Sequence, residues 1–547
     1  MEVKYDLPPQ ATCMADPSLS MNASTLSTLS SRLAALTADR VGGMRRGLEK
    51  ESLRVRPDGM LALTPHPAEL GAPLTHPHIT TDFSESQIEL VTGVHPSPEA
   101  CLDELTRVHR EVYRVLAAHG DEMLWVASMP CGLPTDETIP LGRYGTSNIG
   151  RAKSVYRMGL GHRYGRRMQT ISGIHYNWSM PGIDSEAYFG LIRNFRRHSF
   201  LLLYLFGASP AVCSTFVAGR EHGLEPLGPR TMHLPWATSL RMGRLGYQSD
   251  AQATLAVSYN HLEGYAASLQ EALTVPYPPY EAIGIRNLGG EYNQLSTTLL
   301  QIENEFYGTI RPKRVIHQGE RPLHALRERG VEYVEVRLMD LNPFLDVGID
   351  AGTMRFLDLF LLHALLTDSP PDTPEELAAL KHNQHLTASR GREPGLRLER
   401  HGSEVVLTEW AHELLEEMAP IAAHLDAVGG GQAHVQALAE ARRRLAAPET
   451  LPSAQVLEAL RRDVEQGSFV GFVRSRSAAT RAAMLAQPLA PDQEAAFRHM
   501  AEASVAERQR IEAADTMPFE IFRQCYVSAE RLMPAAMRRA QTAGCGS

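Results

Sequence analysis

The sequence lacks any apolar stretch long enough to cross a membrane. Its most hydrophobic segments, residues 200–206 and 356–366, fall far short of the ~20 residues that a transmembrane helix needs, so we expect both to be core helices. The N-terminus carries acidic residues and prolines in place of the apolar core of a signal peptide. The six cysteines form no CxxC motif and no metal-binding spacing, which is typical of reduced thiols in the cytosol. We therefore predict a cytoplasmic protein that does not engage a membrane.

Two common nucleotide-binding signatures are also missing. There is no GxxxxGK[ST] motif and no GxGxxG after a predicted strand, which argues against a P-loop ATPase and a dinucleotide-binding domain. Acidic residues outnumber basic ones, 63 to 54, and no basic stripe stands out, so a nucleic-acid partner is not expected. An acidic enzyme that handles anionic small molecules must instead carry local cations or metal ions in its site.

The order of predicted elements indicates an α+β fold. Strands are spread through the first two thirds of the chain rather than alternating with helices, which favours a mostly antiparallel sheet. Residues 142–153 are rich in Gly, Ser and Thr and predict a loop before a basic helix at 154–167. Beyond about residue 400 the chain is almost entirely Ala, Leu, Glu and Arg at helical period. We predict a disordered extension at 1–23, a catalytic α+β domain at 24–395, and a helical C-terminal region at 396–547 packed on it.

The segment at residues 45–55, RRGLEKESLRV, carries the first candidate for chemistry. In an extended chain Glu49 and Glu51 point to the same face. Two carboxylates about 4 Å apart at an effective dielectric near 20 repel by roughly 4 kcal/mol. Such a pair persists either because a hard cation such as Mg²⁺ lies between the groups or because water bathes them, with Lys50 and Arg54 nearby as neutralising charges.

Three further predicted strands place polar groups opposite an apolar face. They carry Glu89, His175 beside Asn177, and Glu335 with Arg337. A solvated sheet face is the plain alternative, but such a face favours Lys and Thr over carboxylate, imidazole and guanidinium. Converging carboxylates would hold Mg²⁺ and, through it, a nucleotide triphosphate. Candidate phosphate-binding cations are Arg241, Arg337 and the run at 311–314, which otherwise reads as a solvated basic loop.

Ten blocks of this sequence resemble those of a known family and occur in the same order. They are RRGLEKESLRV, ITTDFSESQIELVT, MPCGLP, YGTSNIGRAKSVYRMGL, RYGRRMQTISGIHYNWSMP, YLFGASPAVC, ATSLRMGRLGYQ, LQIENEFYGTIRPKRV, EYVEVRLMDLNPF and EAADTMPF. The family is the proteobacterial type of glutamate–cysteine ligase (γ-glutamylcysteine synthetase), and the resemblance covers roughly residues 28 to 520. It implies a glutamine synthetase-like fold, in which a curved, mostly antiparallel sheet holds the active site on its concave face.

The resemblance also implies the site residues and their ligands. It predicts two or three Mg²⁺ ions, with Mn²⁺ as an alternative, held by Glu49, Glu51, Asp82, Glu89, His175 and Glu335. Arg337 would contact the transferred phosphate and, with Glu335, form the catalytic pair. The amino-acid pockets would be lined by Phe83, Tyr156, Leu160, Gln169, Arg241, Tyr247 and Tyr307.

The implied reaction joins the γ-carboxylate of L-glutamate to the amine of L-cysteine by way of γ-glutamyl phosphate, with ATP as a substrate. A related ligase that joins glutamate to a different amine is the nearest alternative. A metal-dependent phosphohydrolase would use the same carboxylates without an amine pocket, and a non-catalytic sensor would need fewer of them. The partners are small molecules, and we expect a monomer.

Overall fold

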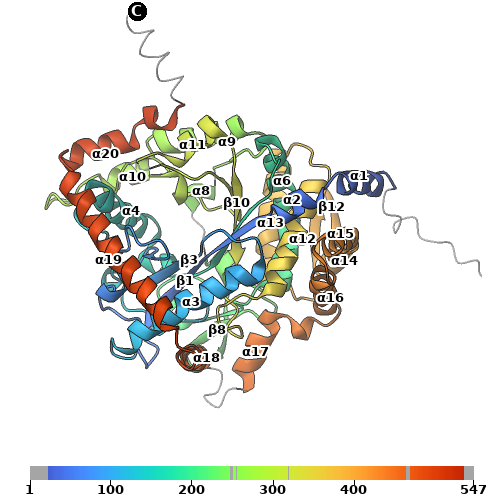
Figure 1. Cartoon of the computed structure of the whole chain (residues 1–547), viewed down its shortest axis with the longest axis horizontal. Helices are drawn as coiled ribbons and strands as arrows, with labels where there is room; N and C mark the ends of the chain where they lie inside the picture. Colours follow the sequence, from blue (N-terminus) through green and yellow to red (C-terminus); the bar gives the residue numbers. More distant parts are fainter. Residues whose placement is uncertain (1–22, 247–249, 254, 318, 463–467, 535–547) are drawn as a thin grey trace, which may run out of the picture.

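The computed structural model describes residues 23–246, 250–253, 255–317, 319–462 and 468–534 (Figure 1). Nearly all of the predicted N-terminal extension and Tyr247 lie outside these residues. Across the described ranges no helix combines the length and the hydropathy that spanning a bilayer requires.

A seven-stranded sheet forms the centre of the molecule. Six strands follow one another across it, each antiparallel to its neighbour: β2 (Ile79–Thr81), β3 (Gln87–Val91), β1 (Arg45–Val55), β5 (Ile174–Ser179), β10 (Tyr333–Met339) and β9 (Ile310–Lys313). The short β4 (Met123–Leu124) pairs with the end of β1. The predicted α+β class with an antiparallel sheet is confirmed, whereas its curvature stays a prediction.

The apolar face of this sheet packs on long helices. Ile174, Tyr176 and Trp178 of β5 alternate with polar residues and are completely buried, as the period of a strand requires. Against this face lie α3 (Pro98–Ala117), α6 (Ser185–Phe206) and α12 (Ala351–Leu366). Both predicted core helices are therefore confirmed, and Figure 1 shows α3, α6 and α12 on the side of the sheet opposite α4 (Asn148–Tyr164).

One buried ion pair connects the sheet to α12. Arg46 of β1 donates to Asp358 of α12, with Nε 2.8 Å from Oδ2, and the Tyr176 hydroxyl donates to the other carboxylate oxygen at 2.7 Å. Asp358 is fully buried and Arg46 nearly so. Their charges satisfy one another inside the core, which fixes the sheet against the helix.

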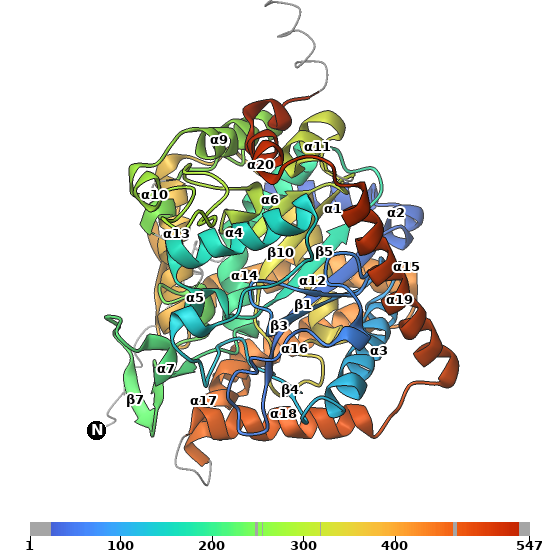
Figure 2. The same ribbon diagram turned by 90° about the vertical axis from the view of Figure 1, so that its left-hand side faces the viewer.

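The C-terminal third is helical after one hairpin. Strands β11 (Arg397–Arg400) and β12 (Ser403–Val406) turn at His401 and Gly402, which both take positive φ values. The sequence analysis did not predict this hairpin, because the Ala- and Leu-rich composition that follows it indicates helix. The helices are α14 (Leu407–Glu417), α15 (Ala419–Gly429), α16 (Ala433–Ala446), α17 (Pro452–Arg462), α18 (Phe469–Leu485), α19 (Pro491–Ala514) and α20 (Phe519–Val527). Because α18 packs on α3 and α20 on α4, this region contacts both sides of the sheet, as Figure 2 illustrates.

Candidate active site

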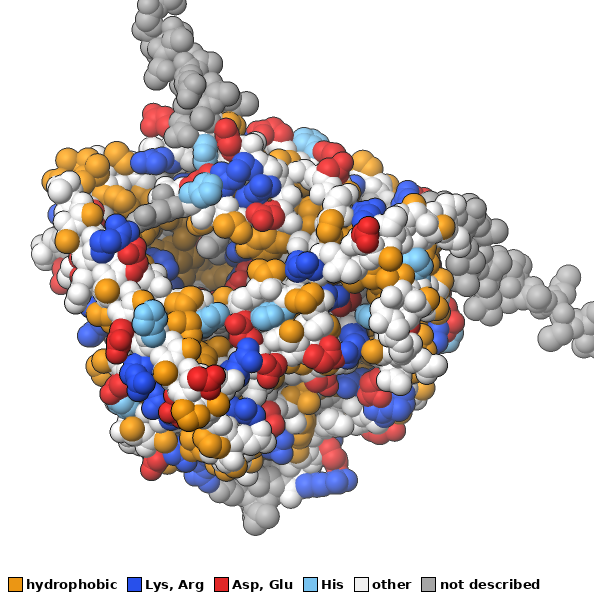
Figure 3. Space-filling view, viewed as in Figure 1, with side chains coloured by type: hydrophobic (Ala, Val, Ile, Leu, Met, Phe, Trp, Pro, Cys, Tyr) orange, Lys and Arg blue, Asp and Glu red, His pale blue; other side chains and the backbone are white. Residues whose placement is uncertain are grey.

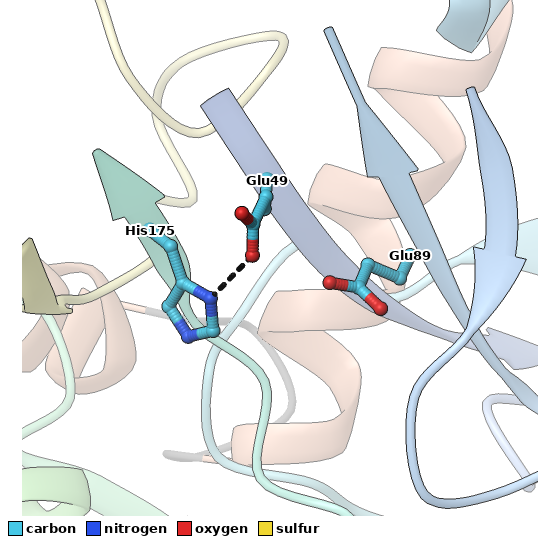
Figure 4. Close-up of side chains that lie close together, drawn as sticks. All are labelled: Glu49, Glu89 and His175. Atoms are coloured by element: carbon cyan, nitrogen blue, oxygen red, sulfur yellow. Dashed lines mark hydrogen bonds and ion pairs between the residues drawn. The ribbon is translucent and has the colours of Figure 1, made fainter. Parts of the chain in front are cut away.

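The strand register brings the predicted ligands together on the polar face of the sheet. Glu51 lies directly opposite Glu89 across β1 and β3, and Glu49 lies opposite His175 across β1 and β5. Ligand atoms of Glu49, Glu89 and His175 all lie within 4.8 Å of one another (Figure 4). Three residues that are far apart in sequence therefore converge because their strands are neighbours.

Glu49 is held by two neighbours on β5. His175 Nδ1 lies 3.0 Å from Glu49 Oε2, and the Asn177 amide donates to Oε1 at 2.9 Å. Burial and the charge of Glu335 would raise the pKa of Glu49, but the interactions with His175 outweigh them and lower it. Burial, followed by the charge of Arg337, lowers the pKa of His175, so its imidazole is kept neutral and able to bind a metal ion.

Glu51 and Glu89 are in the opposite electrostatic situation. Glu51 is only 3% exposed, and the Gly173 N–H donates to its Oε2 at 2.8 Å. Burial and then the charge of Asp82 raise the pKa of Glu51 to about 8. Burial and then Glu49 raise the pKa of Glu89 well above its usual range. Without a compensating cation, ionisation of both carboxyls is therefore disfavoured.

Glu335 lies among cations at the other end of the site. Its carboxylate is 3.3 Å from Lys313 Nζ, 3.3 Å from Arg337 Nη1 and 3.8 Å from Arg311 Nη1. Burial opposes ionisation, but Lys313 and Arg337 lower the pKa of Glu335 well below its usual range. Among the described residues its buried Oε2 accepts no hydrogen bond. The same oxygen lies within ion-pair distance of Arg337 and Arg311, and an ionised carboxylate of this kind is suited to a metal ion.

The two solvated alternatives that the sequence allowed are wrong. Lys50 points to the other face, where its Nζ lies 2.8 Å from His109 Nε2 and burial lowers its pKa to about 7. Arg54 is fully buried and pairs with Glu122 at 2.7 Å. Neither cation neutralises Glu49 or Glu51. Arg311 does not belong to a solvated loop either, because it lies on β9 and is 5% exposed.

A cavity of about 360 Å³ opens beside Arg337, lined also by Arg241, Gln252 and Tyr307. Arg241 is 1% exposed and donates from Nη2 to the Arg337 carbonyl at 2.7 Å. Its guanidinium lies against Gly173, where a Cβ would collide with it. Gly173, just before β5, thus leaves room for the Arg241 guanidinium, whose charge partly offsets the rise in the pKa of Glu51.

The remaining pocket residues fall into two groups. Gln169 donates to the Tyr307 hydroxyl at 2.7 Å. Phe83, Tyr156 and Leu160 belong to one apolar cluster. Tyr156 also lines a second cavity of about 480 Å³.

Figure 3 shows the surface hollowed where α4, α10 (Pro278–Ile283), α20 and β10 surround an opening in Figure 1.

Asp82 completes the acidic set from the turn after β2. Its backbone carbonyl accepts hydrogen bonds from the Tyr144 hydroxyl, at 2.9 Å, and from Arg157 Nε. Sequence reasoning missed Tyr144, Arg157 and also Lys153, which lines the second cavity with Arg157. A signal was present, because Lys153 and Arg157 are four residues apart on α4 and share a helix face.

The donor set fits hard divalent cations. It consists of carboxylate oxygens and one neutral imidazole, the ligand types that Mg²⁺ and Mn²⁺ accept in proteins. Two of its carboxylates have raised pKa values, and the pKa of a third, Glu335, is lowered by the cations beside it. Cations bound here would relieve the repulsion between Glu51 and Glu89. Beside Arg337 such a site is suited to phosphoryl transfer.

Comparison with known proteins agrees with this geometry. The sequence profile of the family described as glutamate-cysteine ligase matches residues 32–387. This chain belongs to the glutamate–cysteine ligase family. The match includes every strand of the central sheet and every predicted site residue.

Curated glutamate–cysteine ligases are similar over nearly the whole chain. The protein from Pseudomonas fluorescens is 47% identical over 525 residues, which cover 92% of this chain and 98% of the relative. The one from Azotobacter vinelandii is 48% identical over 501 residues, covering 88% and 93%. The similarity therefore reaches beyond residue 387 into the helical C-terminal third.

Solved structures agree with the family assignment. A glutamate–cysteine ligase from Francisella tularensis, crystallised in complex with AMP, superposes with a TM-score of 0.84 at 35% identity, covering 89% of this chain and 97% of that one. A bifunctional glutathione synthetase from Pasteurella multocida gives a TM-score of 0.67 at 24% identity, covering 87% and 58%, which shows a shared fold alone.

Proposed function

We propose that this chain joins the γ-carboxylate of L-glutamate to the amine of L-cysteine in two steps, the activity that names its family. In the first, a γ-carboxylate oxygen attacks the γ-phosphorus of ATP, which forms γ-glutamyl phosphate and releases ADP. In the second, the cysteine amine attacks the acyl carbon, the C–O bond to phosphate breaks, phosphate leaves with the electron pair, and the nitrogen gives up a proton to yield the amide. The juxtaposition of the acidic cluster with Arg337 and Arg241 is the observation that supports this reading most.

We assign Mg²⁺ binding to the acidic face of the sheet. Glu49, Glu51, Asp82, Glu89, His175 and Glu335 would hold two or three ions. Bound Mg²⁺ would supply charge neutralisation for the phosphates of ATP. Glu335 and Glu49, whose pKa values are lowered, would offer ionised oxygens to these ions, whereas Glu51 and Glu89, whose pKa values are raised, would have to give up protons to act as ligands.

The protein's own cations would stabilise the transferred phosphoryl group. Arg337 lines the cavity of about 360 Å³ and lies 3.3 Å from Glu335, which supports a role for its guanidinium in binding the transferred phosphoryl group. Arg311 and Lys313 lie on the neighbouring strand and add positive charge around the same carboxylate. Positioned positive charge of this kind accounts for most of the catalysis of phosphoryl transfer.

The amino-acid pockets would lie on the two sides of this centre. Arg241 is our candidate partner for the carboxylate of cysteine, since it is a buried cation on the cavity wall. The walls around the small thiol would come from Phe83, Tyr156, Leu160, Gln169, Tyr247 and Tyr307. The close Gln169–Tyr307 hydrogen bond supports the placement of these two side chains in one wall.

The decisive experiment measures ADP release by purified protein with MgATP while glutamate and cysteine are omitted in turn. Turnover that requires both amino acids and yields γ-glutamylcysteine is expected. ATP use that requires glutamate but ignores cysteine would point to a different amine. Turnover without any amino acid would indicate a phosphohydrolase, and none under any condition would contradict an enzymatic role.

We also propose that the protein works as a monomer in the cytoplasm. ATP and reduced cysteine are both available in that compartment, where thiols stay reduced. Light scattering after size exclusion should give a mass near the 60.4 kDa of one chain. A mass of twice that value would contradict the monomer.

A further inference from the structure

The block EAADTMPF, residues 512–519, has no place in the chemistry described so far. It forms the junction between α19 and α20, far along the chain from the strands of the site. Figure 1 shows these two helices beside α4, on the side of the sheet that carries the site. The junction therefore contacts the helix that supplies Tyr156 and Arg157.

The junction satisfies the N-terminal end of α4. Asp515 accepts two hydrogen bonds from Asn148, one from the backbone N–H and one from the side-chain amide, whose Nδ2 lies 2.9 Å from Oδ1. The same amide donates to the Met517 carbonyl at 2.8 Å. One residue upstream of the cap, the Thr146 N–H donates to Glu512 Oε1 at 2.7 Å. The side chain of the helix's own cap, Ser147, accepts the Gly150 N–H at 3.3 Å.

These bonds do more than cap a helix. The first N–H groups of a helix lack partners within it, and a carboxylate there is favoured by the helix dipole. Here the carboxylate comes from the junction that follows α19. It accepts hydrogen bonds from both the backbone and the buried side chain of Asn148, which is 5% exposed. Two bonds from one side chain fix the position of α4 along its axis and its rotation about that axis.

An apolar contact extends the same attachment along α4. Phe519, the first residue of α20, clusters with Ala152 of α4 and with Leu295, and Tyr156 packs against this cluster. The guanidinium of Arg151 lies 4.3 Å above the Phe519 ring. One turn of α4 is thus held between Asp515 at its start and Phe519 at its side.

The residues on the following turn face the site. Arg157 bonds the backbone of Asp82, and Lys153 and Tyr156 line the cavity of about 480 Å³. A small rotation of α4 would move all three. Positioning errors of this size reduce catalysis even when they arise far from the reacting atoms.

We propose that Asp515 is a positioning residue for the amino-acid pocket, acting through Asn148 on the orientation of α4. This inference rests on the proposed function, in which Tyr156 forms part of the wall around cysteine. Removing the carboxylate then affects the use of cysteine more than the use of ATP.

The test compares Asp515→Ala, Asp515→Asn and the matched control Arg510→Ala, in which an exposed residue of α19 that pairs with Glu507 is replaced. Asp515→Ala should lower kcat/KM for cysteine about tenfold while the KM for ATP changes less than about twofold. Asp515→Asn keeps an oxygen that can accept the Asn148 N–H and should lose less. Arg510→Ala should match the wild type.

A reciprocal exchange separates positioning from general destabilisation. Asn148→Asp alone places two carboxylates together and should impair cysteine use. Combined with Asp515→Asn it restores a donor–acceptor pair with the roles reversed, while the Met517 carbonyl still lacks its donor, so cysteine use should recover in part. Equal losses for ATP and cysteine, or no recovery in the double variant, would overturn the proposal.

Hydrogen exchange gives a readout that does not depend on turnover. In Asp515→Ala the amides of residues 146–150 should exchange at least tenfold faster, while those of β1 stay protected. Unchanged exchange at 146–150 would overturn the proposal. If the variant exchanges faster as expected but the wild type makes no γ-glutamylcysteine, the attachment of α4 stands and the proposed function has failed.

Discussion

Glu51 and Glu89 face each other as a registered pair across β1 and β3, although like charges in directly opposite positions destabilise a sheet. Both carboxyls have raised pKa values, so without a cation their ionisation is disfavoured and the repulsion between them is reduced. A site built in this way would bind metal ions in exchange for protons.

The first prediction concerns Glu51→Gln and stability. The pKa of Glu51, about 8 in the folded protein, lies above its ordinary 4.5. Its contribution to stability is therefore fully present below pH 4.5 and is lost as pH rises to about 8, at about 1.4 kcal/mol for each pKa unit. The variant cannot ionise here, so it should gain stability relative to the wild type between pH 5 and pH 9.

The measurement is urea unfolding of both proteins at pH 5 and pH 9 with divalent cations removed. Glu320→Gln is a useful contrast, because Arg329 lowers the pKa of that carboxyl to about 2 and its loss should not stabilise the protein at high pH. An identical pH dependence of wild type and Glu51→Gln would show that Glu51 does not hold its proton.

The second prediction concerns metal binding itself. Titration of the metal-free protein with Mg²⁺ at pH 7 should release protons, since Glu51 and Glu89 must ionise to act as ligands. Calorimetry in buffers of different ionisation enthalpy counts these protons. Glu51→Gln should release fewer and bind more weakly. Binding that is independent of the buffer would contradict the assignment.

Glu335→Gln and Glu51→Gln should both abolish ligation. Glu51→Gln should stabilise the protein, whereas Glu335→Gln should destabilise it. Glu335 compensates Arg311, Lys313 and Arg337, so its neutralisation leaves under-satisfied cations at a cost of roughly 1–3 kcal/mol. We expect a loss of at least about 100-fold in kcat for either variant. Near-normal turnover in one of them would remove that residue from the metal site.

A further prediction tests the cysteine pocket. Gln169→Leu breaks the hydrogen bond to Tyr307 and should raise the KM for cysteine more than the KM for ATP. Tyr247→Ala should do the same if that residue contributes to the wall. Parallel increases for both substrates would mean that the pocket lies elsewhere.

The buried pair beneath the sheet should dominate stability without touching substrate. Asp358→Ala leaves Arg46 without its partner and should cost roughly 3–5 kcal/mol. The exposed pair of Arg56 and Asp58 provides the control, since Asp58→Ala should cost less than about 1 kcal/mol. Similar unfolding free energies for the two variants would contradict the assignment of Asp358 to the core.

Local pattern determined much of this protein. The period of two along β1, β5 and β10 separates buried from polar side chains, so the apolar face and Glu49, Glu51, His175 and Glu335 could be placed on opposite sides from the sequence. The order of the sequence blocks identified the family. Periodicity also predicted the helices that cover the apolar face.

Tertiary structure decided which of these residues meet. A period of two cannot say that Glu51 lies opposite Glu89, or that Arg311 and Lys313 belong to a strand beside Glu335, because register depends on the packing of the whole sheet. Similarly, α4 begins at Asn148 inside a segment whose glycines and serines predict a loop. Asp515 supplies that helix start with a partner from hundreds of residues away, and no local pattern contains such a contact.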